Sequence, residues 1–127
     1  MSRVKIKEGG NKMKLLIVDD DANVQRLYKE ELEEEGHYVI IAATGKSALE
    51  KFETEKPDLV TMDILMPDID GISVMRKMKE QRPDVPVLMS TAYDYRDDFA
   101  VWASEAYILK SSDLSELKEQ IKKFSDM

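Results

Sequence analysis

Residues 59–71 read Leu-Val-Thr-Met-Asp-Ile-Leu-Met-Pro-Asp-Ile-Asp-Gly, and this stretch decides the fold class of the chain. Leu59–Met62 is a short apolar run of the kind that forms a strand buried on both faces. The polar residues around Pro67 then predict a loop, and Asp70-Gly71 is typical of the start of a helix. Apolar residues recur after Gly71 at helical spacing. The stretch therefore predicts a strand, a loop and a helix, in that order.

The same alternation extends in both directions from this stretch. Similar apolar runs predict four more strands, at Lys14–Val18, Tyr38–Ala42, Val85–Met89 and Ala106–Leu109. Amphipathic segments of helical length separate or follow them, with apolar positions at Val24, Leu27, Tyr28 and Leu32, at Ala48, Leu49 and Phe52, at Ile72, Met75 and Met78, at Phe99 and Trp102, and at Leu114, Leu117 and Ile121. Strands joined by single helices must run parallel with right-handed crossovers. The sequence predicts a (βα)₅ α/β domain, an open five-stranded parallel sheet with helices on both faces.

Residues that typically begin or end helices support these boundaries. Gly36 lies where the first helix should end, and Asp113 is placed to cap the last helix, with Glu116 at capping-box spacing. Gly45-Lys46-Ser47 resembles part of a phosphate-binding loop, but the glycine required five residues earlier is Ile40. This segment therefore predicts a turn and a helix start.

Composition limits the classes of function. The 127 residues carry 19 basic and 26 acidic side chains, a net charge of −7, which argues against sequence-independent nucleic-acid binding and against an anionic membrane surface. The chain has no cysteine, and no apolar run is long enough to span a bilayer. We expect a cytoplasmic protein with one domain over residues 13–127, preceded by a flexible extension over residues 1–12.

Polar residues follow the predicted strands at the edge where parallel α/β sheets bind ligands. Asp19-Asp20-Asp21 follow the first strand, Asp63 the third, Thr91 the fourth and Lys110 the fifth. Close carboxylates repel by about 4 kcal/mol per pair at an effective dielectric near 20, and a hard cation such as Mg²⁺ relieves this repulsion. One carboxylate can then attack phosphorus, while a hydroxyl and an ammonium group stabilise the phosphoryl oxygens.

Each of these residues taken alone has a simpler interpretation. Asp19–Asp21 could cap the first helix, Asp63 and Thr91 could be turn residues, and Lys110 could be a solvated surface lysine. His37, the single histidine, is interpreted as structural or solvated rather than as a phosphoryl carrier. The convergence of the four strand ends favours the phosphoryl-transfer interpretation.

Four motifs in this order resemble the receiver domain of response regulators, the chemotaxis-regulator-like family. They are LLIVDDD (residues 15–21), LVTMDILMPDIDG (59–71), VLMSTAYD (87–94) and AYILKS (106–111). The resemblance covers the chain from about Met13 to Phe124. It implies a doubly wound, flavodoxin-like sheet with strand order 2-1-3-4-5.

The resemblance also implies roles for individual residues. The acidic pair Asp19 and Asp20 would hold Mg²⁺, for which Mn²⁺ could substitute, and Asp63 would be both phosphoacceptor and metal ligand. The backbone carbonyl of Leu65 would complete the protein ligands, Thr91 and Lys110 would be the switch hydroxyl and the active-site lysine, and Tyr107 would be the switch aromatic.

The implied function is that of a stand-alone response regulator in two-component or phosphorelay signalling. A histidine kinase or a histidine phosphotransfer protein would supply the phosphoryl group to Asp63, and a population shift would reshape the surface of the fourth helix, the fifth strand and the last helix. Because the chain ends soon after its last helix, no DNA-binding output domain is expected. Such a protein is not an enzyme on external substrates.

Two departures from the family pattern leave alternatives open. Ser111 follows Lys110 where the family usually has proline, and the segment from Thr91 to Tyr107 is shorter than usual. Both would suit a phosphorylation-independent interaction module. A Mg²⁺-dependent phosphohydrolase is less favoured, because such enzymes have an aspartate two residues after the nucleophile, and that position here is Leu65.

Overall fold

A computed structural model describes residues 12–64, 66–91, 106–109 and 113–126 of the chain. In chain order its elements are β1 (Lys14–Val18), α1 (Ala22–Glu34), β2 (Tyr38–Ala42), α2 (Gly45–Glu55), β3 (Leu59–Met62), α3 (Gly71–Gln81), β4 (Val87–Thr91), β5 (Ala106–Leu109) and α4 (Ser115–Ser125). The fourth of the five predicted helices, with Phe99 and Trp102, lies outside the described residues, so the label α4 belongs to the last predicted helix.

The strands form one parallel sheet in the order β2-β1-β3-β4-β5. β1 lies between β2 and β3, since Leu16 pairs with Ile40 on one side and with Val60 on the other. This confirms the prediction of a flavodoxin-like parallel sheet over β2, β1, β3 and β4. At the far edge β5 pairs with β4, from Leu88 opposite Ala106 to Thr91 opposite Leu109.

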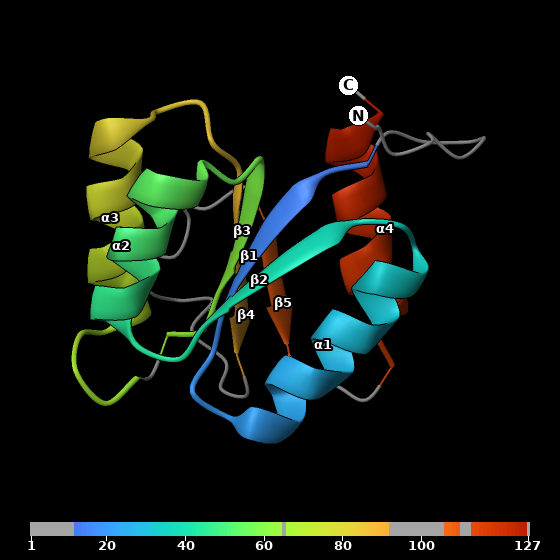
Figure 1. The fold of residues 1–127 in the computed structure, drawn as a ribbon, viewed down its shortest axis with the longest axis horizontal. Helices are drawn as coiled ribbons and strands as arrows, with labels where there is room; N and C mark the ends of the chain where they lie inside the picture. Colours follow the sequence, from blue (N-terminus) through green and yellow to red (C-terminus); the bar gives the residue numbers. More distant parts are fainter. Residues whose placement is uncertain (1–11, 65, 92–105, 110–112, 127) are drawn as a thin grey trace.

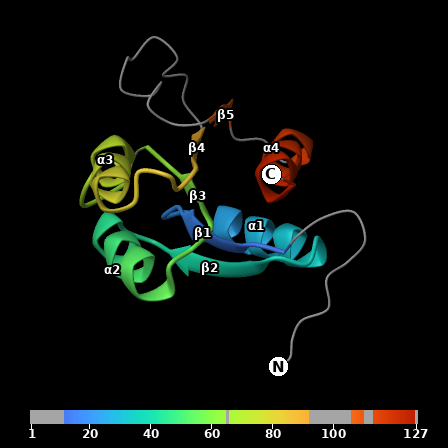
Figure 2. The same cartoon turned by 90° about the horizontal axis from the view of Figure 1, so that it is seen from above.

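Two helical layers cover the sheet, α2 and α3 on one face and α1 and α4 on the other (Figures 1 and 2). The core under α2 and α3 includes Val18, Phe52, Met62, Val74, Met75, Met78 and Met89. The core under α1 and α4 includes Leu15, Ile17, Leu32, Leu88, Ile108, Leu117 and Ile121. The strands are apolar on both faces because each face has its own helical layer. Among the described helices, none is long and apolar enough to cross a membrane.

Side chains next to the helix ends explain where most helices begin and stop. Asp21, Thr44 and Asp70 are the N-caps of α1, α2 and α3, and each accepts a hydrogen bond from a backbone N–H of the first turn. α1 ends at Glu34, followed by Gly36 with φ of 97°, a conformation that favours glycine. The predicted helix end near Gly36 and the helix starts at Asp70-Gly71 and Gly45 are confirmed.

Two boundary predictions are corrected. β4 begins at Val87 rather than Val85 and extends to Thr91, because Pro86 has no N–H for the ladder, whereas Ser90 and Thr91 still pair with β5. Asp113 is not the N-cap of α4: that position is Leu114, which forms no side-chain cap. The Asp113 carboxylate instead accepts the N–H and hydroxyl of Ser115, and these bonds lower the pKa of Asp113.

A buried polar contact links α1 with β4, two elements far apart in the sequence. The hydroxyls of Tyr28 on α1 and Ser90 on β4 are 2.8 Å apart, and Tyr28 belongs to the apolar core under α1 and α4. Both residues are buried, with 3% and 2% of their surface exposed. Because buried hydroxyls cost free energy when they lose a partner, this bond fixes how α1 sits over the carboxyl-terminal end of β4.

We predict that Tyr28→Phe lowers the free energy of unfolding by about 1–2 kcal/mol, because the buried Ser90 hydroxyl loses this partner. The double variant Tyr28→Phe/Ser90→Ala should lose less than the sum of the two single variants, since both hydroxyls are then removed. Urea unfolding of the four proteins measures this coupling. Strict additivity would mean that the two hydroxyls do not interact.

Candidate metal centre and phosphoacceptor site

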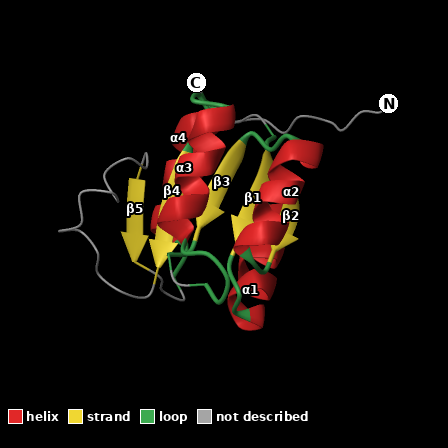
Figure 3. Ribbon diagram, turned by 90° about the vertical axis from the view of Figure 1, so that its left-hand side faces the viewer, coloured by secondary structure: helices red, strands yellow, loops and turns green. Residues whose placement is uncertain are grey.

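The site lies at the carboxyl edge of the sheet, where all the strands end on one side (Figure 3). Asp19 follows β1 and Asp63 follows β3, and these two strands are neighbours. Hydrogen bonding continues past the strand ends, because the Asp63 N–H donates to the Val18 carbonyl and the Asp19 N–H donates to the Ala42 carbonyl, each over 3.0 Å. The backbone of both aspartates is therefore held by the sheet itself.

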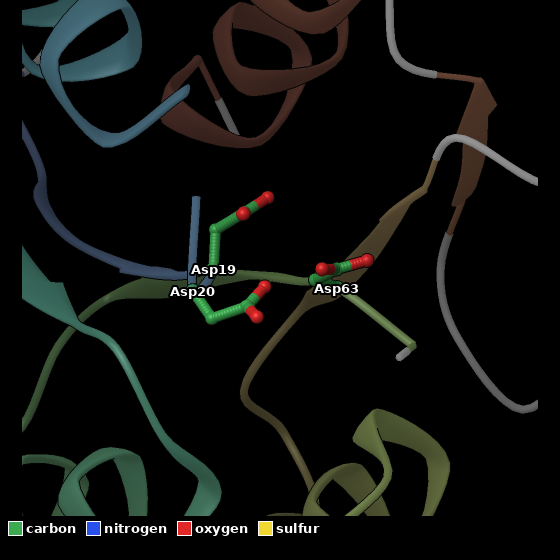
Figure 4. Close-up of side chains that lie close together, drawn as sticks. All are labelled: Asp19, Asp20 and Asp63. Atoms are coloured by element: carbon green, nitrogen blue, oxygen red, sulfur yellow. The ribbon is translucent and has the colours of Figure 1, made fainter. Parts of the chain in front are cut away.

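Asp19, Asp20 and Asp63 bring their carboxylates together, with one oxygen from each lying within 4.8 Å of the others (Figure 4). Asp19 and Asp63 are buried, with 2% and 5% of their surface exposed, whereas Asp20 is exposed. An Asp19 carboxylate oxygen accepts the Asp21 N–H over 2.9 Å, which orients that side chain. Two carboxylates of the cluster are thus buried in the protein, and the third lies on the side that faces solvent.

Asp21, the third acid of the run, has a different task. Its carboxylate accepts the N–H groups of Asn23 and Val24, over 2.8 and 3.4 Å, as the N-cap of α1. The helix-cap interpretation therefore holds for Asp21 and not for the whole run. Among the described residues, the carboxylate cluster consists of Asp19, Asp20 and Asp63 and does not include Asp21.

The chemistry of the cluster fits a hard divalent cation. Three carboxylate oxygens from separate side chains offer the ligand type that Mg²⁺ prefers, and a few such ligands leave positions for water or phosphate oxygens. Mutual repulsion among the carboxylates is largest where they are buried, because the local dielectric is low. A bound cation would relieve this repulsion, so the arrangement fits Mg²⁺ binding.

Gly71 is a site residue whose role the sequence did not reveal. A Cβ atom built at Gly71 would lie 1.9 Å from the Asp63 carbonyl oxygen and 3.0 Å from the Ile64 Cα. The Gly71 N–H also donates to the Ile64 carbonyl over 2.7 Å. The backbone at the start of α3 therefore lies directly against the backbone of Asp63, the candidate phosphoacceptor. Asp70-Gly71 predicted only a helix start, because no local pattern shows which backbone the glycine approaches.

Several predicted residues cannot be placed at this site. Leu65 and Lys110 lie outside the described residues, as does the Lys110-Ser111 bond. For Thr91 and Tyr107 the structure describes the strand backbone, while their side chains fall outside the description. These four assignments remain predictions.

His37 lies away from the carboxylate cluster. Its Nδ1 atom accepts the Met13 N–H over 3.1 Å, at the start of β1 and β2. Burial, followed by the nearby Lys12 charge, lowers the pKa of His37 and so favours the neutral imidazole that can accept this bond. The structural interpretation of His37 is the one that this contact supports.

A profile of the response regulator receiver domain family matches residues 15–122. The parallel sheet and the carboxylate cluster at its carboxyl edge agree with this match. The chain therefore belongs to the response regulator receiver domain family, as its motifs predicted, and it is a receiver domain of the two-component type.

Relatives of known sequence give the same assignment. The alkaline phosphatase synthesis transcriptional regulatory protein PhoP of Bacillus subtilis is 44% identical over 85 residues, which cover 67% of this chain and 35% of PhoP. Sporulation initiation phosphotransferase F of the same organism is 32% identical over 114 residues, covering 87% of this chain and 92% of that protein. The chain thus spans about a third of PhoP and nearly all of the phosphotransferase.

The solved structures of TrrA from Thermotoga maritima are close in both sequence and fold. TrrA in complex with Mg²⁺-BeF has a TM-score of 0.84 and 42% identity, covering 87% of this chain and 97% of TrrA. TrrA in complex with the histidine kinase ThkA has a TM-score of 0.82 at the same identity, with the same coverage of both chains.

We predict that Mg²⁺ raises the melting temperature of the parent chain and not that of Asp20→Asn. A ligand present at a hundred times its dissociation constant stabilises a protein by about 2.7 kcal/mol. In EDTA, Asp20→Asn should have a higher melting temperature than the parent, because it removes one repelling charge from the cluster. Thermal denaturation followed by circular dichroism, with and without Mg²⁺, measures both effects. An equal Mg²⁺ effect in the two proteins would exclude Asp20 as a ligand.

We predict that Gly71→Ala lowers the free energy of unfolding by about 1–3 kcal/mol, the usual cost of overpacking. The gain in helix propensity from alanine, about 1 kcal/mol, does not offset a Cβ clash with backbone. Urea unfolding gives the value, and Glu80→Ala, at an exposed position of α3, is the matched control. A Gly71→Ala protein as stable as the control would contradict the close approach to Asp63.

Proposed function

We propose that this chain accepts a phosphoryl group on Asp63 and thereby switches a protein-interaction surface. The observation that carries the proposal is the position of Asp63, a buried carboxylate at the end of β3, beside Asp19 and Asp20. Membership of the receiver family supports the same assignment. Because Asp63 is buried, its position favours reaction with one bound phosphoryl donor over reaction with solutes from bulk solvent.

The proposed reaction is a direct displacement at phosphorus. A carboxylate oxygen of Asp63 forms a bond to phosphorus, and the bond between phosphorus and the donor nitrogen of a phosphohistidine breaks, with its electron pair returning to the imidazole. The product is an aspartyl phosphate. Water later attacks phosphorus, which restores the Asp63 carboxylate and releases inorganic phosphate.

We assign the surrounding roles by matching positions in the family. Asp19, Asp20, Asp63 and the backbone carbonyl of Leu65 would hold Mg²⁺, with Mn²⁺ as a possible substitute. When bound, the ion would neutralise charge on the phosphoryl oxygens. Thr91 would donate its hydroxyl to one phosphoryl oxygen, and Lys110 its ammonium group to another. β4 and β5 support this, since they end side by side at Thr91 and Leu109.

The proposed donor is a histidine kinase or a histidine phosphotransfer protein. Support comes from TrrA, which is 42% identical and was solved in complex with the histidine kinase ThkA. We further propose that phosphorylation draws Thr91 inward, that Tyr107 follows, and that this shifts the population toward an active surface on the β4–β5 side of the sheet. Its partner would be a protein rather than a nucleic acid or a membrane.

We also propose that residues 13–127 form one complete (βα)₅ receiver domain in the cytoplasm. The extension over residues 1–12 would precede this domain, and the fourth predicted helix, with Phe99 and Trp102, falls outside the described residues. The parallel pairing of β5 with β4 supports that completion, because parallel neighbours need a crossover connection.

The test is the intact mass of the protein after incubation with Mg²⁺ and acetyl phosphate, a small phosphodonor. We predict a gain of one phosphoryl group in the parent and none in Asp63→Asn, whose amide is not a nucleophile. EDTA should abolish the gain. Asp58→Asn, a change of the same charge at the opposite edge of the sheet, is the control and should still gain the group.

Two results would contradict the proposal. A gain in Asp63→Asn would place the acceptor elsewhere. No gain in the parent, either with acetyl phosphate or with a phosphorylated histidine kinase, would favour a phosphorylation-independent interaction module. Continuous release of phosphate from simple phosphate esters would instead indicate a phosphohydrolase.

A further inference from the structure

Asp68, in the loop between β3 and α3, makes contacts that the phosphoacceptor role does not explain. One of its carboxylate oxygens accepts the Gly45 N–H and the other accepts the Lys46 N–H, each over 2.9 Å. Both donors belong to the first turn of α2, more than twenty residues earlier in the chain. Asp68 therefore joins the loop after the phosphoacceptor to a different helix.

These two amides need a partner from outside their own helix. The first N–H groups of any helix have no intrahelical acceptor. In α2 the Thr44 hydroxyl takes the Ser47 N–H and the Thr44 carbonyl takes the Ala48 N–H, which leaves Gly45 and Lys46 to Asp68. The two hydrogen bonds from the Gly45 and Lys46 amides lower the pKa of Asp68. Its carboxylate is therefore ionised at neutral pH and complements the positive end of the helix dipole.

Apolar packing holds the loop against the same point. A Cβ atom built at Gly45 would lie 3.1 Å from the Ile69 Cβ and 2.9 Å from a Val74 methyl group. Met66 and Ile69 are partly buried against the core under α2 and α3. The loop is thus seated on the start of α2 by both hydrogen bonds and side-chain packing.

The two ends of the loop are also fixed. At one end the Asp63 N–H is bonded to β1, and the Ile64 carbonyl accepts the Gly71 N–H over 2.7 Å. At the other end Asp70 caps α3 by accepting the Ser73 N–H over 2.9 Å. Asp68 supplies the anchor between these ends, so it restrains the described part of the β3–α3 loop between Ile64 and the start of α3.

We propose that Asp68 is a positioning residue for the metal centre, which sets Mg²⁺ affinity by holding the β3–α3 loop on α2. The proposal rests on the proposed function, because it takes Asp19, Asp20 and Asp63 as the metal ligands, and the loop that Asp68 holds begins directly after Asp63. Groups that orient metal ligands without touching the metal typically change affinity by about 10–100-fold. Asp68 acts through backbone rather than on a ligand directly, so the expected effect is smaller, about 3–10-fold.

The experiment is a calorimetric titration of the full chain with Mg²⁺, for the parent, Asp68→Asn, Asp68→Ala and Asp84→Asn. The asparagine keeps the shape but directs an amide NH₂ at a backbone N–H, and the alanine removes both acceptors. We expect the Mg²⁺ dissociation constant to rise about 3–10-fold in Asp68→Asn and at least as much in Asp68→Ala. Asp84→Asn, with the same charge change at an exposed position before β4, should match the parent.

The conditions separate positioning from charge and from stability. About 0.15 M salt screens distant charges, and work well below the melting temperature keeps every variant folded, as checked by circular dichroism. Unchanged Mg²⁺ affinity in both Asp68 variants, whatever their loss of stability, would overturn the proposal. An equal weakening in Asp84→Asn would also overturn it, because net charge would then be the cause.

The readout is also independent of phosphoryl transfer. If the parent bound Mg²⁺ but took no phosphoryl group, the proposed function would fail and the titrations would still decide the role of Asp68. If the parent bound no Mg²⁺, both the metal centre and the positioning role would be wrong.

Discussion

The close approach of the Asp19, Asp20 and Asp63 carboxylates at the carboxyl edge of the sheet is the constraint on which the candidate site depends. Two of these carboxylates are buried, where like charges repel more strongly than in water, so bringing the three together has a cost in free energy. The adjacent strands β1 and β3 force the aspartates together, since their backbones are hydrogen-bonded past the strand ends. The two apolar layers on the sheet supply the stability that offsets this cost. The cluster is therefore a site maintained by the fold and not a local preference.

The surroundings of the cluster are closely packed on one side. Gly71 brings α3 against the Asp63 carbonyl, and Asp68 ties the intervening loop to α2. Both contacts belong to the face of the sheet that α2 and α3 cover. This arrangement suits a site where a small group must be held in one geometry, because catalysis of phosphoryl transfer depends mostly on positioning and electrostatics.

The opposite face is organised differently. Under α1 and α4 a buried pair of hydroxyls, on Tyr28 and Ser90, joins α1 to the end of β4 next to Thr91. A salt bridge of 2.6 Å between Lys118 and Glu31 connects α4 with α1 nearer the surface. α1 and α4 therefore cover the same face of β4 and β5. The end of β4 is thus joined to α1 by a buried hydrogen bond, and α1 is joined to α4 by a salt bridge.

Periodicity and strand-end residues in the sequence predicted the alternation of strands and helices, the parallel sheet, and the aspartates at its carboxyl edge. Those features depend on patterns within a few residues, such as the apolar run Leu59–Met62 followed by Asp63. The start of β4 and the capping of α4 were predicted wrongly. Pro86 can lie inside an apolar run without belonging to the strand, and Asp113 can accept hydrogen bonds from Ser115 without being the N-cap of the helix.

Only the tertiary structure decided which of three consecutive acids is a helix cap, why position 71 must be glycine, and what Asp68 and Tyr28 contact. The two partners of Asp68 lie 22 and 23 residues away in the chain, and the partner of Tyr28 lies 62 residues away. No local pattern carries such information, because the pairing depends on how separate elements pack and not on their own conformational preferences.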